Sequence, residues 1–321
     1  MSARVRVRRA LEGAGGVVAR GAVHQGGARP IPQPFGRSRA VEGEAVRAIP
    51  VTAVTPAPDG VCFLAAIQQY VIDGHFGLVP VVRARVAAAA LARRNWALGR
   101  VAGAEEEFVV VPGGRLDPGQ RAAVGTADLS VLESDAGPEP HPLLDRWAAV
   151  RVTDGRRAAA ERRAARDALA ASDGPLVVDR PLAGLADLPG RDRMIGVVRR
   201  HETLYLEGAG LAAALTLAPG HRTSVFAWSA GDGGPAADGN GDVTYSWYLR
   251  LWPATDDDLL HGLIRVERKD LSGPAADADR VSGWLLADRA PIAAPDPDWD
   301  RRLYPLHQVE AYLRAQGGGW R

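Results

Sequence analysis

Apolar and β-branched residues recur in short runs along most of the chain, and turn-forming residues separate these runs. The first two strands are predicted at residues 61–72 and 78–86, and residues 73–77 (Asp-Gly-His-Phe-Gly) have the chemistry of a hairpin turn. An alanine-rich segment follows this hairpin. The same patterns predict further strands at residues 108–111, 176–179, 194–198, 204–206, 221–228, 243–252 and 263–267.

Two segments have helical composition and spacing. Residues 156–171 consist mainly of Ala, Arg, Glu and Leu, with Thr153 or Asp154 available as a cap, and Ser-Asp-Gly-Pro follows as a stop signal. A last helix is predicted from near Pro305 to residue 315. Strands, a helix, more strands and a closing helix indicate a mixed α/β or α+β fold.

The composition also changes along the chain. Residues 1–59 are rich in Gly, Arg and Pro and predict an N-terminal arm or small lobe, whereas residues 60–321 form the main domain. Within that domain, an insertion is predicted at about residues 112–145. A flexible glycine-rich loop is expected at residues 230–242, between two strands.

Charge and single residue types exclude several classes of protein. The formal net charge of +1 neither favours nor excludes a nucleic-acid partner. Lys269 is the only lysine and follows an arginine, so the chain has no phosphate-binding loop of its own, and any ATP-driven motor must be a partner. Cys62 lies in an apolar run and is expected to pack in a strand. Without a signal peptide or an apolar membrane span, we expect a cytoplasmic protein with no membrane contact.

Two acidic side chains are predicted to face the core. Glu161 shares the apolar face of its helix with Ala165 and Leu169, and Asp179 ends the apolar run 176–178. Burying an ionised carboxylate costs several kcal/mol unless a cation or hydrogen-bond donors satisfy it. One divalent cation could satisfy both, and Glu310, which borders the inward stripe of the last helix, could supply a third carboxylate.

Oxygen ligands of this kind favour Mg²⁺ or Mn²⁺ and are what metal-assisted phosphodiester hydrolysis requires. The same three acids also allow a purely structural interpretation. In it, Glu161 pairs with a neighbouring arginine, Asp179 caps the turn before Pro181, and Glu310 is solvated. His307, beside Glu310, is either a proton shuttle or an ordinary residue of the first helical turn.

Four segments, in this order and spacing and with Glu161 ahead of them, resemble the NurA nuclease family over most of the chain. They are Leu-Val-Val-Asp-Arg-Pro-Leu at 176–182, Ile-Gly-Val-Val-Arg at 195–199, Arg-Val-Glu at 265–267 and Tyr-Pro-Leu-His-Gln-Val-Glu at 304–310. The resemblance implies a ribonuclease H-like fold and Mn²⁺- or Mg²⁺-dependent DNA cleavage. It also implies a homodimer working beside a HerA-like hexameric ATPase in DNA end processing or phage defence.

The resemblance assigns roles to individual residues and also marks departures. Asp179, Glu161 and Glu310 are implied as metal ligands, and Arg199 stands where the family has a lysine near the scissile phosphate. Arginine can bind that phosphate but cannot transfer a proton. Arg180 replaces the glycine that follows the second acid, which narrows the space near the metal.

The first family acid has two competing alignments in this chain. The first strand carries Ala65 where the family has aspartate, whereas Asp73 lies nearby in the predicted turn. We favour Ala65 as the equivalent position, because a catalytic acid belongs on a strand. Two functions therefore remain open: a metal-dependent DNA nuclease, or a catalytically inactive DNA-binding or scaffold subunit of the same kind.

Overall fold

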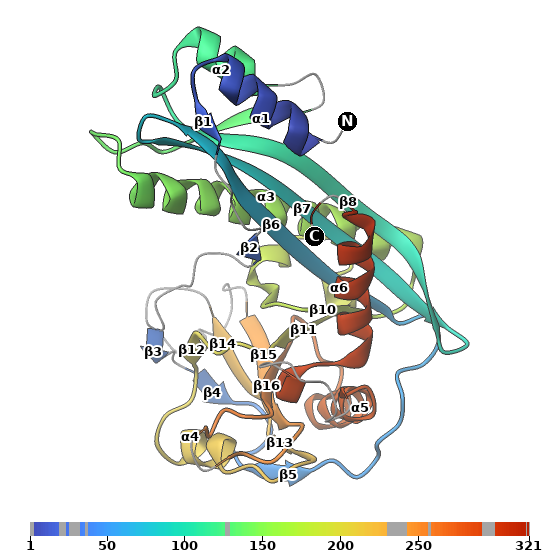
Figure 1. The fold of residues 1–321 in the computed structure, drawn as a ribbon. Helices are drawn as coiled ribbons and strands as arrows, with labels where there is room; N and C mark the ends of the chain where they lie inside the picture. Colours follow the sequence, from blue (N-terminus) through green and yellow to red (C-terminus); the bar gives the residue numbers. More distant parts are fainter. Residues whose placement is uncertain are drawn as a thin grey trace.

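The computed structural model describes residues 3–18, 24–25, 33–35, 38–125, 129–229, 243–255, 258–290, 299–318 and 320. The predicted loop at residues 230–242 lies outside these ranges. Most of the described strands form one large mixed sheet whose main path is β4-β14-β15-β16-β11-β10-β6-β7-β8-β9, with helices on both faces, and β12 and β3 form a separate two-stranded sheet (Figure 1). The predicted mixed α/β class is therefore confirmed. In the described ranges, no helix has the length and apolar composition needed to cross a membrane.

The long hairpin of the sheet turns at a different point from the predicted one. β6 (Cys62–Phe76) pairs antiparallel with β7 (Val79–Arg94), and the chain turns at Gly77, whose φ is +58°. Asp73 and Gly74 lie within β6, at an irregularity in the pairing, so the prediction that they form the turn is wrong. Gly74 is required because a Cβ there would lie 2.3 Å from a carbonyl oxygen of a neighbouring strand.

The alanine-rich segment after residue 86 continues β7 and pairs with β8 (Ala97–Pro112). Small side chains on this strand allow helices to pack closely over both faces of the sheet. On the side of β6 away from β7, the next two strands of the sheet are short and buried. β10 (Leu176–Val178) lies between β6 and β11 (Met194–Val198) and is parallel to both. β11 was predicted with these boundaries and β10 with one additional residue, Asp179, because both apolar runs are flanked by turn residues.

Two helices cover opposite faces of β6 and β7. Ala164, Ala165 and Ala168 of α3 (Pro142–Ala171) pack with Leu64 and Val86. The alternate residues of the same strands face the other way and pack against α6 (Tyr304–Gln316), whose inward side chains are Leu306, Val309 and Leu313. Figure 1 shows the two helices on either side of the sheet. Side chains at the end of β10 can therefore reach either helix.

Helix α3 is about twice as long as predicted. It begins at Pro142 after a cap by His141, and Thr153 lies inside it, where its Oγ1 donates to the Ala149 carbonyl at 2.9 Å. Gly155 is also internal. Packing of the first half of the helix on the sheet outweighs the low helix propensity of these two residues.

The remaining elements complete the sheet and its borders. Within the first 59 residues, β4 pairs with β14 and β5 pairs with β13. The predicted insertion contains α2 and β9, and β9 lies parallel to β8. The elements not yet given are α1 (Ala3–Gly13), β1 (Val17–Val18), β2 (His24–Gln25), β3 (Gln33–Phe35), β4 (Ser38–Ala40), β5 (Ala48–Pro50), α2 (Pro118–Val124), β9 (Ser130–Ser134), β12 (Thr203–Leu204), α4 (Gly208–Leu215), β13 (His221–Thr223), β14 (Phe226–Ser229), β15 (Val243–Arg250), β16 (Leu263–Arg268) and α5 (Pro274–Ala287), with short 3₁₀ turns at Leu182–Leu185, Arg191–Arg193 and Trp299–Arg301.

Candidate functional site

Asp179 lies at the end of β10, beside the first long strand of the sheet. Its backbone N–H donates to the carbonyl of Leu64 at 3.2 Å, which places Asp179 next to Ala65 on β6. Ala65 and Val177 both belong to the α6 side of the core, and alternation along each strand puts Asp179 on that side as well. This register places Ala65, and not Asp73, beside Asp179.

Arg199 joins Asp179 to Glu310. It follows β11, donates from Nε to Oδ1 of Asp179 at 2.7 Å and from Nη2 to Oδ2, and also donates from Nη2 to Oε1 of Glu310 at 2.9 Å. Arg314 donates to the other oxygen of Glu310 at 3.1 Å. The two carboxylate side chains are only 12% and 11% exposed, so these bonds replace most of their hydration.

Glu161 lies on the opposite side of the sheet end. Its side chain is 1% exposed, as the helical spacing predicts, and its Oε2 accepts from Arg180 at 2.6 Å and from Arg157 at 3.4 Å. Because Asp179 and Arg180 are adjacent, one contacts α6 and the other contacts α3. Glu310 on α6 and Glu161 on α3 therefore approach the end of β10 from opposite faces of the sheet. Glu310 shares Arg199 with Asp179, whereas Glu161 pairs with Arg180 and Arg157.

The carboxylates influence one another electrostatically. Burial raises the pKa of Asp179 to about 6; Arg199 opposes this shift, and the charges of Glu310 and Glu161 add to it. Burial also raises the pKa of Glu310, but Arg199 and Arg314 outweigh it and hold that pKa below its usual value. Burial by itself lowers the pKa of Arg199. The charges and hydrogen bonds of the two carboxylates outweigh burial and raise this pKa above its usual value, so the guanidinium stays charged.

The donor set does not fit a divalent cation in this arrangement. Three carboxylates face four guanidinium groups, those of Arg157, Arg180, Arg199 and Arg314, so the charge of the acids is compensated without a metal. Across the described ranges, no three His, Cys, Asp or Glu side chains form a group that could hold a metal ion. The predicted Mn²⁺ or Mg²⁺ ligation by Asp179, Glu161 and Glu310 therefore stays a prediction.

Asp73, the alternative first acid, is not brought to this site. It lies eight residues beyond Ala65 on β6, roughly 26 Å away at about 3.3 Å per residue. Its carboxylate is buried and accepts from Nε of Arg83 at 2.7 Å. Asp73 therefore belongs to a separate ion pair at the far end of the hairpin.

His307 lies one turn before Glu310 on α6. Its Nδ1 lies 2.6 Å from Nη1 of Arg302, and because the guanidinium can only donate, Nδ1 is the acceptor. Arg302 also contributes to lowering the pKa of Glu310. His307 is thus placed beside the carboxylates through an arginine, and a role in proton transfer stays a prediction.

Sequence reasoning missed several polar residues near the site. Arg157 and Arg314 were not recognised, because arginine supplies nearly all the positive charge and no single one stood out. Glu267 was noticed only as part of a motif: it is fully buried, accepts from Arg265 at 2.8 Å and from the Leu182 N–H at 2.8 Å. The Arg-Val-Glu spacing, which puts both polar residues on one face of a strand, is the signal that predicts this pair.

Three large aromatic residues of the C-terminal strands belong to the core. Trp247 and Tyr248 are fully buried, Trp228 nearly so, and the indole of Trp247 donates to the Ser282 hydroxyl at 2.9 Å. These side chains contribute to packing and present no exposed ring on which a nucleobase could stack.

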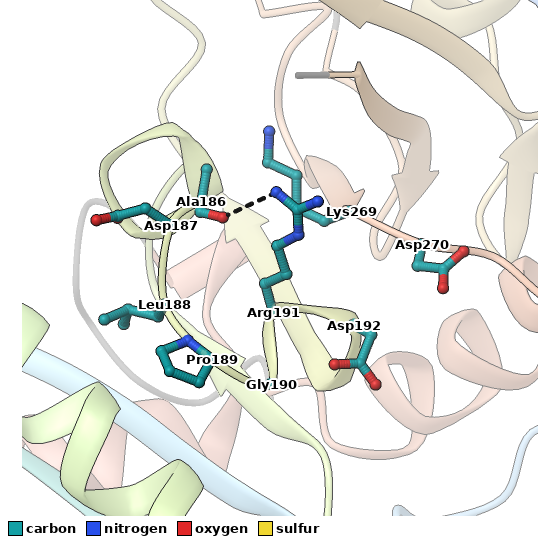
Figure 2. A pocket seen from close by; sticks show the side chains of 9 residues that line it. All are labelled: Ala186, Asp187, Leu188, Pro189, Gly190, Arg191, Asp192, Lys269 and Asp270. Atoms are coloured by element: carbon teal, nitrogen blue, oxygen red, sulfur yellow. Dashed lines mark hydrogen bonds between the residues drawn. The ribbon is translucent and has the colours of Figure 1, made fainter. Parts of the chain in front are cut away.

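A surface pocket of about 620 Å³ lies away from the predicted acids. It is lined by residues 186–192 with Lys269 and Asp270, and Arg191 crosses it to donate to the Ala186 carbonyl at 3.2 Å (Figure 2). Figure 2 shows the three aspartates of its wall pointing in different directions. The pocket therefore lacks a convergent set of reactive groups, and the end of β10 remains the candidate site.

The fold and site describe a mixed α/β protein with a carboxylate–arginine cluster where parallel strands end. The structure is similar to that of the NurA nuclease from Sulfolobus solfataricus, with a TM-score of 0.47 and 9% sequence identity over 81% of this chain and 80% of that chain. The likeness is one of fold. No family model and no curated protein matches the sequence.

Proposed function

We propose that this chain is a DNA-binding or scaffold subunit of the NurA type that does not cleave DNA in its present form. The observation that carries the proposal is the compensation of Glu161, Asp179 and Glu310 by four arginines, next to Ala65 where the family has an acid. A site without its first carboxylate and with a surplus of guanidinium groups suits phosphate binding better than metal binding.

The partners in this proposal follow from the resemblance. The chain works as a homodimer beside a HerA-like hexameric ATPase, in DNA end processing or phage defence. Lys269 supports the need for a separate motor, because the only lysine is not placed to form a phosphate-binding loop. The Arg199 guanidinium gives up its hydrogen bond to one of the two carboxylates and binds a DNA phosphate instead.

A metal-dependent nuclease is the second candidate, and one observation favours it. Asp179 and Glu310 lie close enough to share the Arg199 guanidinium, which is the convergence that a nuclease requires of its acids. In that alternative, DNA phosphate draws Arg199 away and the freed carboxylates take up Mn²⁺ or Mg²⁺.

The two candidates differ in what the wild-type chain does to linear DNA with Mn²⁺. The proposal expects binding that weakens as salt increases, measured by fluorescence anisotropy, and full-length DNA on a gel after prolonged incubation. Degradation that requires Mn²⁺ and disappears in Asp179→Asn would establish the nuclease instead. A chain that binds no DNA even at low salt would contradict both the DNA-binding role and the nuclease, and would leave only the role of a scaffold.

A further inference from the structure

A tryptophan occupies the tip of the hairpin formed by β7 and β8. The two strands are paired up to Arg94 and Ala97, which leaves Asn95 and Trp96 as a two-residue turn. Both have positive φ, 49° and 65°, as in a type I′ turn. Asparagine suits the first position, but the second favours glycine, and a bulky side chain is strained there.

The Trp96 side chain contributes little to the core in return for this strain. The residue is 77% exposed, and no other large hydrophobic residue in the described ranges is as exposed. Asp59 holds the turn in place, because its carboxylate oxygens accept from the Asn95 N–H at 3.1 and 3.2 Å. A strained residue on an anchored turn is a feature of functional sites rather than of packing.

Two exposed arginines lie on the strands behind Trp96. Arg94 ends β7, and Arg100 pairs with Leu91 on the side of the sheet that α6 covers, so alternation puts the two arginines on opposite faces of the hairpin. Figure 1 shows the tip projecting at the end of the hairpin formed by β7 and β8, away from the helices that cover its middle. An exposed aromatic ring with an arginine on the strand behind it suits a ligand with flat rings and phosphates.

We propose that Trp96 stacks on an unpaired nucleobase of DNA while Arg100, on the same face of the hairpin as the carboxylate–arginine site, contacts a neighbouring phosphate. This inference rests on the proposed DNA-binding function and names the form of DNA that the tip recognises. Ala65 pairs with Ala89, seven residues from Trp96, so the tip lies roughly 23 Å along β7 from the carboxylate–arginine site. At the rise of about 3.4 Å per nucleotide of a stacked strand, roughly seven nucleotides connect the two contacts.

The test measures the affinity of the full chain for a labelled single-stranded 20-mer and for a blunt duplex by anisotropy. Trp96→Ala is expected to weaken single-strand binding about tenfold, which is about 1.4 kcal/mol, and to change duplex binding less than about twofold. Trp96→Phe retains a stacking ring and most of the affinity. Oligonucleotides shorter than roughly seven nucleotides should lose the difference between wild type and Trp96→Ala.

Leu78 provides the matched control. This apolar residue is 59% exposed and lies in the turn between β6 and β7, at the opposite end of β7 from Trp96. Leu78→Ala should leave both affinities unchanged. Equal single-strand affinities for wild type and Trp96→Ala would overturn this inference while leaving the proposed function intact. So would a Trp96→Ala variant that changes only the oligomeric state. Failure of the wild-type chain to bind any DNA would overturn the proposed function, and this inference with it.

Discussion

Replacing Arg199 with methionine is expected to lower the free energy of unfolding by about 3–5 kcal/mol at pH 7. Asp179 and Glu310 are nearly buried and share this guanidinium, so its removal leaves two like charges without their common partner. Arg314 still pairs with Glu310, and Asp179 therefore bears most of the loss. Urea denaturation followed by tryptophan fluorescence measures the change.

The loss is expected to be smaller at pH 5. The pKa of Asp179 is raised from 3.8 to about 6, first by burial and then by the charges of Glu310 and Glu161. A carboxyl group with a higher pKa in the folded state binds more protons there, so its contribution to stability grows as pH falls through this window and is lost as pH rises. Without Arg199 that pKa rises further, and the variant gains more on acidification than the wild type does.

Arg200 is the control for the Arg199 experiment. It is the next residue in the chain and is exposed, so Arg200→Met should change the free energy of unfolding by no more than about 0.5 kcal/mol. If Arg199→Met behaves like Arg200→Met, the arginine is not the partner on which the buried carboxylates depend.

Introducing a carboxylate at position 65 is expected to have the second largest effect. Ala65→Asp should lower the free energy of unfolding by about 3 kcal/mol at pH 7 in the absence of metal, because position 65 is fully buried beside Asp179. The added group faces a site whose existing acids already raise the pKa of Asp179. Thermal denaturation at pH 7 and pH 5 measures the effect, and the lower pH should be less damaging.

Ala65→Asn separates charge from size in this experiment. The amide has nearly the same shape without the charge, so it should cost less at pH 7 and show no gain at pH 5. Mn²⁺ is expected to restore part of the stability of Ala65→Asp and none of that of Ala65→Asn, because only the carboxylate adds a ligand of the kind that Mn²⁺ prefers. An Ala65→Asp chain as stable as wild type at pH 7 without metal would show that position 65 is not in an acidic, buried environment.

The sequence predicted the strands that end at the site better than the helices around it. β10 and β11 are apolar runs bounded by turn residues, and their limits followed directly. Residues 87–92 of β7 are rich in alanine, which favours helices, and only their pairing on both sides makes them a strand. Helix α5 was missed, because residues 274–287 contain two aspartates, a serine and a glycine, which have low helix propensity, and only a weak apolar stripe.

The same contrast holds within the site. Helical spacing placed Glu161 on the buried face and Glu310 at the border of the inward stripe, and both are buried. The arginines that pair with these acids could not be predicted, because 38 of the 39 basic residues are arginines. Spacing along the chain does not show which arginine the fold brings next to a given acid. The structural interpretation of Glu161, pairing with a neighbouring arginine, is the one that the contacts of Arg157 and Arg180 confirm.

A Mn²⁺ titration of the wild-type chain shows whether arginines or a metal ion compensate the carboxylates at the end of β10. Electron paramagnetic resonance of free Mn²⁺ at pH 7, with Asp179→Asn in parallel, gives the number of ions bound. We expect identical titrations for the two proteins. One equivalent of Mn²⁺ bound by the wild type and lost in Asp179→Asn would contradict it.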